Sequence, residues 1–191
     1  MFEISLKIDR DHEVWKMLAS NKNPLLTSGH IGTHVDVYNK TEVPKEYLDC
    51  DGVLIDCTKY ELGSEIGVEA IKGVHVKKKD FVIFKTGIQK ENPYGSINYL
   101  KNHYELSWEL IDFLLEKEVS FIGIDCAGIR RGEEHYKADV RCENQKTYVV
   151  ENLSSESLDE IEFNRFKVFT VWIDNPIATG LSTKIFVYGD R

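Results

Sequence analysis

Apolar and polar residues alternate in parts of this chain, most clearly at residues 2–8. That period of two predicts β-strands, because successive side chains of a strand point to opposite faces. Some segments alternate, whereas others are short apolar runs typical of buried strands. The predicted strands cover residues 2–8, 51–57, 81–84, 121–125, 148–151, 165–173 and 184–188.

Helical spacing of apolar residues appears in fewer places. Residues 108–117 give the clearest pattern, since Ser107 is a good N-terminal cap and four apolar side chains at helical spacing follow it. Residues 11–19 and 135–142 are shorter candidates. Ser64 can cap a further helix that reaches residue 72, although a glycine inside that segment disfavours it.

These elements predict an α/β fold. Strands outnumber helices, and only some successive strands have a helix between them, which disfavours a doubly wound parallel sheet. We therefore expect a mixed, curved β-sheet with a few covering helices. The chain has 191 residues without repeats or linkers, so one domain is expected over residues 1–191.

The segment 28–38 holds two histidines and an aspartate within seven residues: His30, His34 and Asp36. In a helix the two histidines would share a face, but Asp36 would lie about 240° further round. In an extended chain all three side chains, with Gly32 among them, would face the same way. We predict the extended form, in which Gly32 leaves room for an ion or a substrate.

Two neutral imidazoles and a carboxylate form a ligand set that suits Zn²⁺, Mn²⁺ or Fe²⁺. The spacing alone leaves an alternative open, an exposed strand with incidental histidines. The order His-x-Gly-Thr-His-x-Asp at residues 30–36 resembles the signature of the metal-dependent cyclase family, which includes bacterial kynurenine formamidases and isatin hydrolases. Residues 123–125 (Gly-x-Asp) and 151–153 (Glu-Asn-Leu) resemble two further segments of that family.

The resemblance implies an α/β fold around a barrel-like sheet, a homodimer and additional metal ligands. The family's carboxylate ligand corresponds to Glu151, whose charge at the end of an apolar strand needs a partner. Its remaining ligand corresponds to Asp139, and a branch of the family with His-x-x-x-Asp adds His135. On a helix His135 and Asp139 share a face, so both can reach one site. The alternative for this pair is a solvated helix face.

One departure from the family follows Asp36. Kynurenine formamidases continue with a proline and then a histidine that moves protons, whereas this chain has Tyr38 and Lys40 there. A lysine of ordinary pKa, near 10.4, is a poor base at neutral pH. We expect Lys40 to point to solvent, and His135 and His103 become the candidates for proton transfer.

Composition and charge narrow the function classes. The formal net charge of −8 argues against a nucleic-acid partner, because phosphate binding needs clustered Lys and Arg. No signal segment or membrane-length apolar run is present, so we expect a cytoplasmic protein without membrane contact. The four cysteines lack C-x-x-C spacing and are expected to be reduced core side chains.

Two assignments stay open from the sequence. Asp125 either caps a turn or faces a cleft. A group of aromatic residues is expected either to wall a pocket or to pack in the core. These aromatic residues are Trp15, Tyr94, Tyr99, Tyr104 and Trp108.

The sequence therefore predicts a hydrolase of a C–N amide bond, linear or cyclic, that acts on a small molecule through a metal-activated water. Zinc is favoured and manganese also fits, with one or two ions. The expected ligands are His30, His34, Asp36, Asp139 and Glu151, with His135 and Glu151 as catalytic groups. The competing hypothesis is a non-catalytic metal- or ligand-binding protein on the same scaffold.

Overall fold

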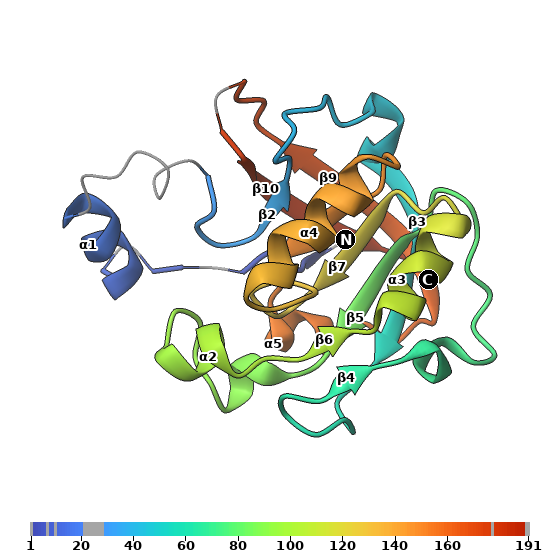
Figure 1. The fold of residues 1–191 in the computed structure, drawn as a ribbon, viewed down its shortest axis with the longest axis horizontal. Coiled ribbons are helices and arrows are strands. Elements are labelled where there is room, and N and C mark those ends of the chain that lie inside the picture. The colour runs from blue at the N-terminus through green and yellow to red at the C-terminus, as the bar shows by residue number, and fades with distance from the viewer. Residues whose placement is uncertain (1, 7, 10, 21–28, 177, 190–191) are drawn as a thin grey trace.

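The computed structural model describes residues 2–6, 8–9, 11–20, 29–176 and 178–189 (Figure 1). Its strands are β1 (Phe2–Glu3), β2 (His34–Asp36), β3 (Asp49–Asp56), β4 (Glu65–Ile66), β5 (Phe81–Lys85), β6 (Glu105–Leu106), β7 (Phe121–Ile124), β8 (Tyr148–Glu151), β9 (Arg165–Trp172) and β10 (Gly180–Tyr188). Its α-helices are α1 (Glu13–Ser20), α2 (Ile97–Lys101), α3 (Trp108–Glu116), α4 (Glu133–Glu143) and α5 (Ser155–Leu158). Short 3₁₀ helices cover Lys45–Leu48, Val68–Ile71 and Ile88–Lys90.

The main sheet closes on itself. Its strand order is β10-β2-β8-β7-β5-β3-β9, β9 pairs again with β10, and β1 lies beside β10. The β3, β5, β7 and β8 strands run parallel to their neighbours in that group, whereas β2, β9 and β10 pair antiparallel. The predicted mixed, curved, barrel-like sheet is therefore confirmed.

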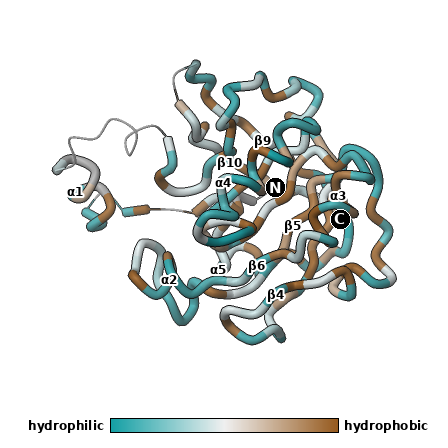
Figure 2. The backbone as a smooth tube through the Cα atoms, viewed as in Figure 1, coloured by the Kyte–Doolittle hydropathy of each residue, from teal (hydrophilic) through white to brown (hydrophobic). Residues whose placement is uncertain are grey.

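Two apolar layers form because side chains alternate across the strands. Along β8, Tyr148 and Val150 belong to the layer that the closed sheet surrounds, whereas Val149 belongs to the layer beneath the helices. Glu151 follows on the same outer side as Val149, where α4 packs on β8. Figure 2 shows apolar residues along central strands such as β5, with hydrophilic residues in the outer turns. The fold thus directs alternate residues of β8 towards α4.

Local sequence explains the start of α3 but not the structure of residues 64–72. The Ser107 hydroxyl accepts a hydrogen bond from the Leu110 N–H at 3.1 Å, so α3 begins as predicted. The predicted helix at 64–72 was wrong, because residues 65–66 form β4 and only Val68–Ile71 is helical, as a 3₁₀ turn. β4 pairs with β6, and extended Gly67 separates it from that turn. Tertiary pairing here overrides the capping signal.

The predicted strand at residues 2–8 is shorter in the structure. β1 ends at Glu3, and Ser5 then makes an isolated antiparallel bridge to Leu153. All four cysteines are unpaired and buried, as predicted. Among the described residues no helix has the length and apolar character to cross a membrane.

Candidate metal centre and active site

Strand β2 is shorter than the extended segment that the sequence predicted. Only His34–Asp36 is a strand, and Gly32, with a φ of +70°, places a bend before it. His34 and Asp36 share the outer face of β2, whereas His30 reaches them across the bend. The His30 ring packs on Gly180, where a Cβ would lie only 3.0 Å from the ring. The three side chains meet as predicted, but strand alternation does not place His30.

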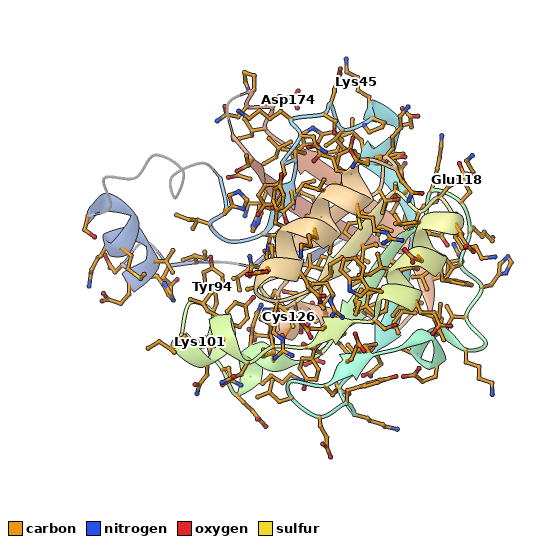
Figure 3. The ribbon with its side chains drawn as sticks, in the orientation of Figure 1. Lys45, Tyr94, Lys101, Glu118, Cys126 and Asp174 are labelled. Carbon is orange, nitrogen blue, oxygen red and sulfur yellow. The ribbon has the colours of Figure 1, made fainter. Side chains whose placement is uncertain are left out.

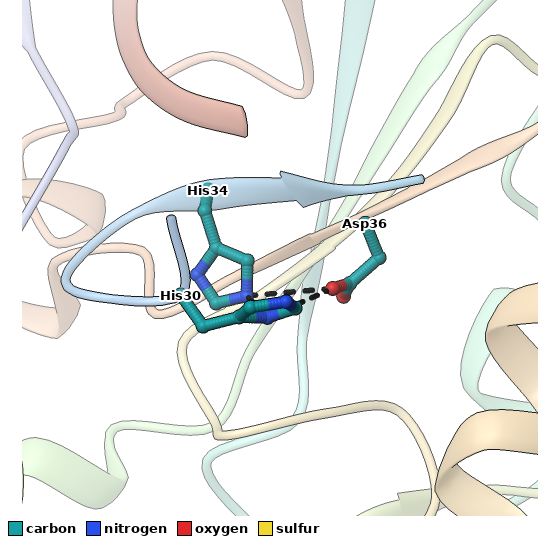
Figure 4. A group of neighbouring side chains, drawn as sticks. All are labelled: His30, His34 and Asp36. Atoms are coloured by element: carbon teal, nitrogen blue, oxygen red, sulfur yellow. Dashed lines mark hydrogen bonds and ion pairs between the residues drawn. The ribbon is translucent and has the colours of Figure 1, made fainter. Parts of the chain in front are cut away.

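His30, His34 and Asp36 point towards one another (Figure 4). His30 Nδ1 lies 3.3 Å from Asp36 Oδ1, and His34 Nε2 lies 3.5 Å from the same oxygen. The two ring nitrogens are 3.2 Å apart. His34 and Asp36 are buried, and His30 is partly exposed. One buried carboxylate oxygen therefore faces two imidazole nitrogens.

Hydrogen bonds behind the rings fix which nitrogen of each histidine faces this point. His34 Nδ1 lies 2.9 Å from the Gly32 carbonyl oxygen and must donate to it, which leaves Nε2 towards Asp36. His30 Nε2 lies 2.8 Å from the Thr179 hydroxyl, which leaves Nδ1 facing Asp36. Each imidazole thus presents one nitrogen to the cluster.

Strand β8 and helix α4 bring further ligand groups to the same place. Glu151 pairs directly with His34 across β8 and β2, and Glu151 Oε2 lies 3.5 Å from His34 Nε2. One helical turn apart on α4, His135 and Asp139 both face this strand. His135 Nε2 lies 3.2 Å from Glu151 Oε1 and 3.2 Å from Asp139 Oδ2. Asp36, His135, Asp139 and Glu151 thus form a second group that shares Asp36 with the first.

Burial and mutual charge shift the pKa values of these groups. Burial alone would lower the pKa of His34, but the Asp36 and Glu151 carboxylates outweigh it and raise it to about 9. Burial, with the nearby Asp36 charge, raises the pKa values of Asp139 and Glu151 well above their ordinary range. The pKa of Asp36 is lowered because the His34 and His30 rings outweigh burial. For His135, burial lowers the pKa. Three carboxyl groups thus crowd a site with little solvent.

The cluster leaves buried oxygens without donors. Both oxygens of Asp36, both of Asp139 and one of Glu151 have no hydrogen-bond partner among the described residues. Unpaired buried carboxylate oxygens are unfavourable, whereas a cation that they coordinate offsets that cost. Imidazole nitrogens and carboxylate oxygens are the donors that Zn²⁺ and Mn²⁺ accept. The residues present therefore fit a divalent metal.

A cleft of about 420 Å³ opens beside this cluster. One end is lined by His30, His34, His135 and Glu151, and the remaining wall is mainly apolar. The apolar wall includes Val14 and Met17 of α1, Ile31, Leu100 and Ala127. A larger hollow of about 690 Å³ lies apart from the cluster and shares only Tyr94 with this cleft. In Figure 3, Tyr94 lies between α1 and α2.

The other residues that the sequence suggested for the site lie away from the cluster. Asp125 is structural: its carboxylate accepts hydrogen bonds from Thr86, from the Gly87 N–H and from the Ser155 hydroxyl. Lys40 is exposed, as predicted. His103 is buried, and its Nδ1 donates to the Tyr104 carbonyl oxygen at 2.8 Å.

The aromatic candidates divide between cleft and core. Tyr94 lines the cleft, whereas Tyr99, Tyr104 and Trp108 pack in the apolar layer beneath the helices. The side chain of Trp15 lies outside the described residues. Tyr38, at the position of the family's proline, has its ring 5.8 Å from His30 and 5.1 Å from Tyr136.

Sequence reasoning missed two residues that support the histidines. Thr179 holds His30 from the loop before β10, and no local signal marks it. Asn152 donates to the Gly32 carbonyl oxygen at 3.1 Å. Its place directly after Glu151 in the Glu-Asn-Leu segment was the available signal.

Comparisons with known proteins agree with this architecture. A potential metal-dependent hydrolase with cyclase activity has a similar structure, with a TM-score of 0.70, 16% sequence identity, and coverage of 100% of this chain and 98% of that chain. Isatin hydrolase A from Labrenzia aggregata, bound to benzyl benzoate, gives a TM-score of 0.69 at 21% identity, covering 84% of this chain and 75% of that chain. An isatin hydrolase bound to the product analogue thioisatinate gives 0.68 at 17% identity, covering 84% and 72%.

A search of curated proteins found no match. Residues 2–130, about two thirds of the chain, match the family described as "Putative cyclase". This segment includes the His30–Asp36 motif and the strands from β1 to β7. The sequence match and the shared fold together establish that this chain belongs to the cyclase family.

Proposed function

We propose that this cyclase-family enzyme is a metal-dependent hydrolase of a C–N amide bond in a small molecule. The observation that carries the proposal is the set of buried carboxylate oxygens on Asp36, Asp139 and Glu151 that lack donors among the described residues. Three acidic groups packed this closely need a cation, because like charges at short distance repel strongly in a buried site. Histidine nitrogens beside them favour a transition metal over Mg²⁺ or Ca²⁺.

Two overlapping ligand groups define where such an ion would bind. His30 Nδ1, His34 Nε2 and Asp36 would hold one ion. Asp36, His135, Asp139 and Glu151 would hold a second, with Asp36 shared between them. We propose zinc for these groups, with manganese as the alternative, since imidazole suits zinc and carboxylate oxygens also suit manganese. The proposal therefore allows one or two ions.

A bound divalent metal supplies Lewis-acid chemistry, since it polarises a carbonyl oxygen and lowers the pKa of water. The chain itself supplies proton transfer and orientation. When a single ion is held by His30, His34 and Asp36, His135 is not a ligand, and burial lowers its pKa and so favours the neutral imidazole. Its Nε2 lies 3.2 Å from Glu151 Oε1, so a proton released by the attacking water can pass between the two side chains. Both line the cleft, where one of them can protonate the leaving nitrogen.

The cleft indicates the kind of substrate. Its apolar wall favours a hydrophobic group, and an amide bound at the polar end would lie against His34 and Glu151. Neither lysine nor arginine lines the cleft in the part of the chain that the structure describes, so a substrate with a required negative charge is disfavoured. The isatin hydrolase relatives are consistent with a compact cyclic amide as substrate.

The test combines metal analysis with an amide panel. Purified protein is analysed for metal content, stripped with a chelator, and reloaded separately with Zn²⁺ and Mn²⁺. Each form is then assayed with cyclic and linear amides, including isatin and N-formyl anilines. Metal-dependent hydrolysis that disappears in Glu151→Gln supports the proposal. Stoichiometric metal without turnover of any amide would instead support the non-catalytic alternative.

A further inference from the structure

The main chain of Gly32 lies directly behind the His34 imidazole and is held from both sides. Its N–H donates to the Tyr94 hydroxyl at 2.8 Å. Its carbonyl oxygen accepts from His34 Nδ1 at 2.9 Å and from the Asn152 side-chain amide at 3.1 Å. Since Gly32 has a φ of +70° in a bend, neighbouring strands do not fix the direction of this carbonyl. Side chains from elsewhere in the fold fix it instead.

Asn152 is itself held rigidly. It is 3% exposed, and the Tyr99 hydroxyl donates to its Oδ1 at 2.5 Å. Because Oδ1 faces Tyr99, the amide nitrogen must face Gly32. Its backbone oxygen accepts from the Thr33 hydroxyl at 2.7 Å, and its φ of +57° suits asparagine better than most residues. The amide therefore has one orientation, set by partners at both ends.

We propose that Asn152 is a positioning residue for His34 and acts through the Gly32 carbonyl oxygen. By holding that carbonyl, Asn152 keeps an acceptor on His34 Nδ1 and keeps Nε2 directed at Asp36 and Glu151. The Asn152 amide nitrogen is 3.5 Å from His34 Nδ1, so the two groups donate side by side to one oxygen. The consequence for metal affinity rests on the proposed function, whereas the orientation of the ring does not.

The variant Asn152→Gly removes the amide but accepts the positive φ without strain. Tyr99→Phe keeps the amide but removes the hydroxyl that orients it. Thr147→Val is the matched control, because it removes a buried hydrogen bond, from the Thr147 hydroxyl to the Val119 carbonyl oxygen at 2.7 Å, at the opposite end of β8. Two quantities are measured for each protein. One is the Zn²⁺ dissociation constant by chelator competition, and the other is the hydrogen-exchange rate of the His34 Nδ1–H in ¹⁵N-histidine spectra of metal-free protein.

We expect Asn152→Gly to weaken Zn²⁺ binding by about 10- to 100-fold, the usual effect of losing a group that orients a metal ligand. The His34 Nδ1–H, slow to exchange in the wild type, should exchange rapidly in this variant. Tyr99→Phe should change the Zn²⁺ dissociation constant and the His34 Nδ1–H exchange rate in the same direction by a smaller factor. If Asn152→Gly does not fold, Tyr99→Phe alone tests the inference. Thr147→Val should lower thermal stability and leave both quantities unchanged.

Wild-type Zn²⁺ affinity together with a slowly exchanging Nδ1–H in Asn152→Gly would overturn the inference. If the wild type itself binds no Zn²⁺, the proposed function fails. The Nδ1–H exchange rate in the metal-free proteins still decides whether Asn152 positions His34. The two failures are therefore distinguishable.

Discussion

His34 and Glu151 lie directly opposite each other on antiparallel strands β2 and β8, and His34 Nε2 is 3.5 Å from Glu151 Oε2. The two residues are far apart in the sequence, yet strand pairing makes them immediate neighbours. Each strand contributes a further polar group to the same outer face or its edge, Asp36 from β2 and Asn152 after β8. The metal centre that we propose is therefore built on the register of one strand pair.

His34→Ala should remove the divalent ion that His30, His34 and Asp36 are proposed to hold. The variant removes an imidazole nitrogen that lies 3.5 Å from both Asp36 Oδ1 and Glu151 Oε2. Metal content per chain, measured after dialysis, checks the prediction, with exposed His75→Ala as the control that should keep the metal. A full complement of ion in His34→Ala would refute ligation by this histidine.

Glu151→Gln should reduce metal affinity at least tenfold while the fold is retained. The substitution keeps the shape of the side chain. It removes a carboxyl group whose pKa is raised by burial and by the Asp36 charge. Because one like charge leaves a crowded carboxylate cluster, the metal-free protein should become more stable, not less. Thermal melts with and without Zn²⁺ measure both effects, and a variant that binds zinc as well as the wild type would contradict the assignment.

Asp125→Ala, unlike Glu151→Gln, should destabilise the fold and leave metal binding unchanged. This buried carboxylate accepts hydrogen bonds from Thr86, Gly87 and Ser155 and makes no contact with the metal cluster among the described residues. Without the Asp125 carboxylate, several buried donors have no acceptor. The free energy of unfolding should therefore fall by about 3 kcal/mol. Denaturant titration measures the loss, and metal stoichiometry in the folded variant should remain that of the wild type.

The metal-free protein should lose stability as the pH rises from about 6.5 to about 9. The pKa of His34 is raised from 6.5 to about 9, so the folded state holds a proton that the unfolded state releases first. A raised histidine pKa gives stability that is complete below 6.5 and is lost as the pH passes through 9. The raised pKa values of Asp139 and Glu151 act in the same direction.

Urea unfolding at several pH values checks this trend, with an expected decrease on the order of 3 kcal/mol from the His34 shift. Saturating Zn²⁺ should flatten or reverse the trend, because metal binding requires the deprotonated ligands. Constant stability of the metal-free protein between pH 6.5 and 9 would show that His34 is not coupled to these carboxylates.

Lys40→Ala should leave hydrolase activity within about twofold of the wild type. Lys40 is exposed and lines a separate hollow with Thr41 and Asp174, not the cleft beside His34. An exposed ammonium outside the cleft is not placed to exchange a proton with a substrate held there. Steady-state assays with the best substrate of the amide panel measure the effect. A large fall in kcat would instead give Lys40 the proton-transfer role.

Sequence alone determined the features that depend on near neighbours. Alternation and short apolar runs predicted most strands, and Ser107 predicted the start of α3, because capping and side-chain direction are local properties. The i, i+4 spacing of His135 and Asp139 on α4 also followed from the sequence. The His-x-Gly-Thr-His-x-Asp motif indicated three residues of the cluster, although Gly32 bends the chain where a continuous strand was predicted.

Only the tertiary structure decided how these pieces meet. The pairing of β2 with β8, the closure of the sheet through β9 and β10, and the packing of α4 on β8 join segments that local patterns do not relate. The same reason explains why Asp125 proved structural and why the Thr179 contact was not predicted. A buried polar side chain takes its role from the partners that surround it, and those partners are chosen by strand register and packing rather than by adjacent residues.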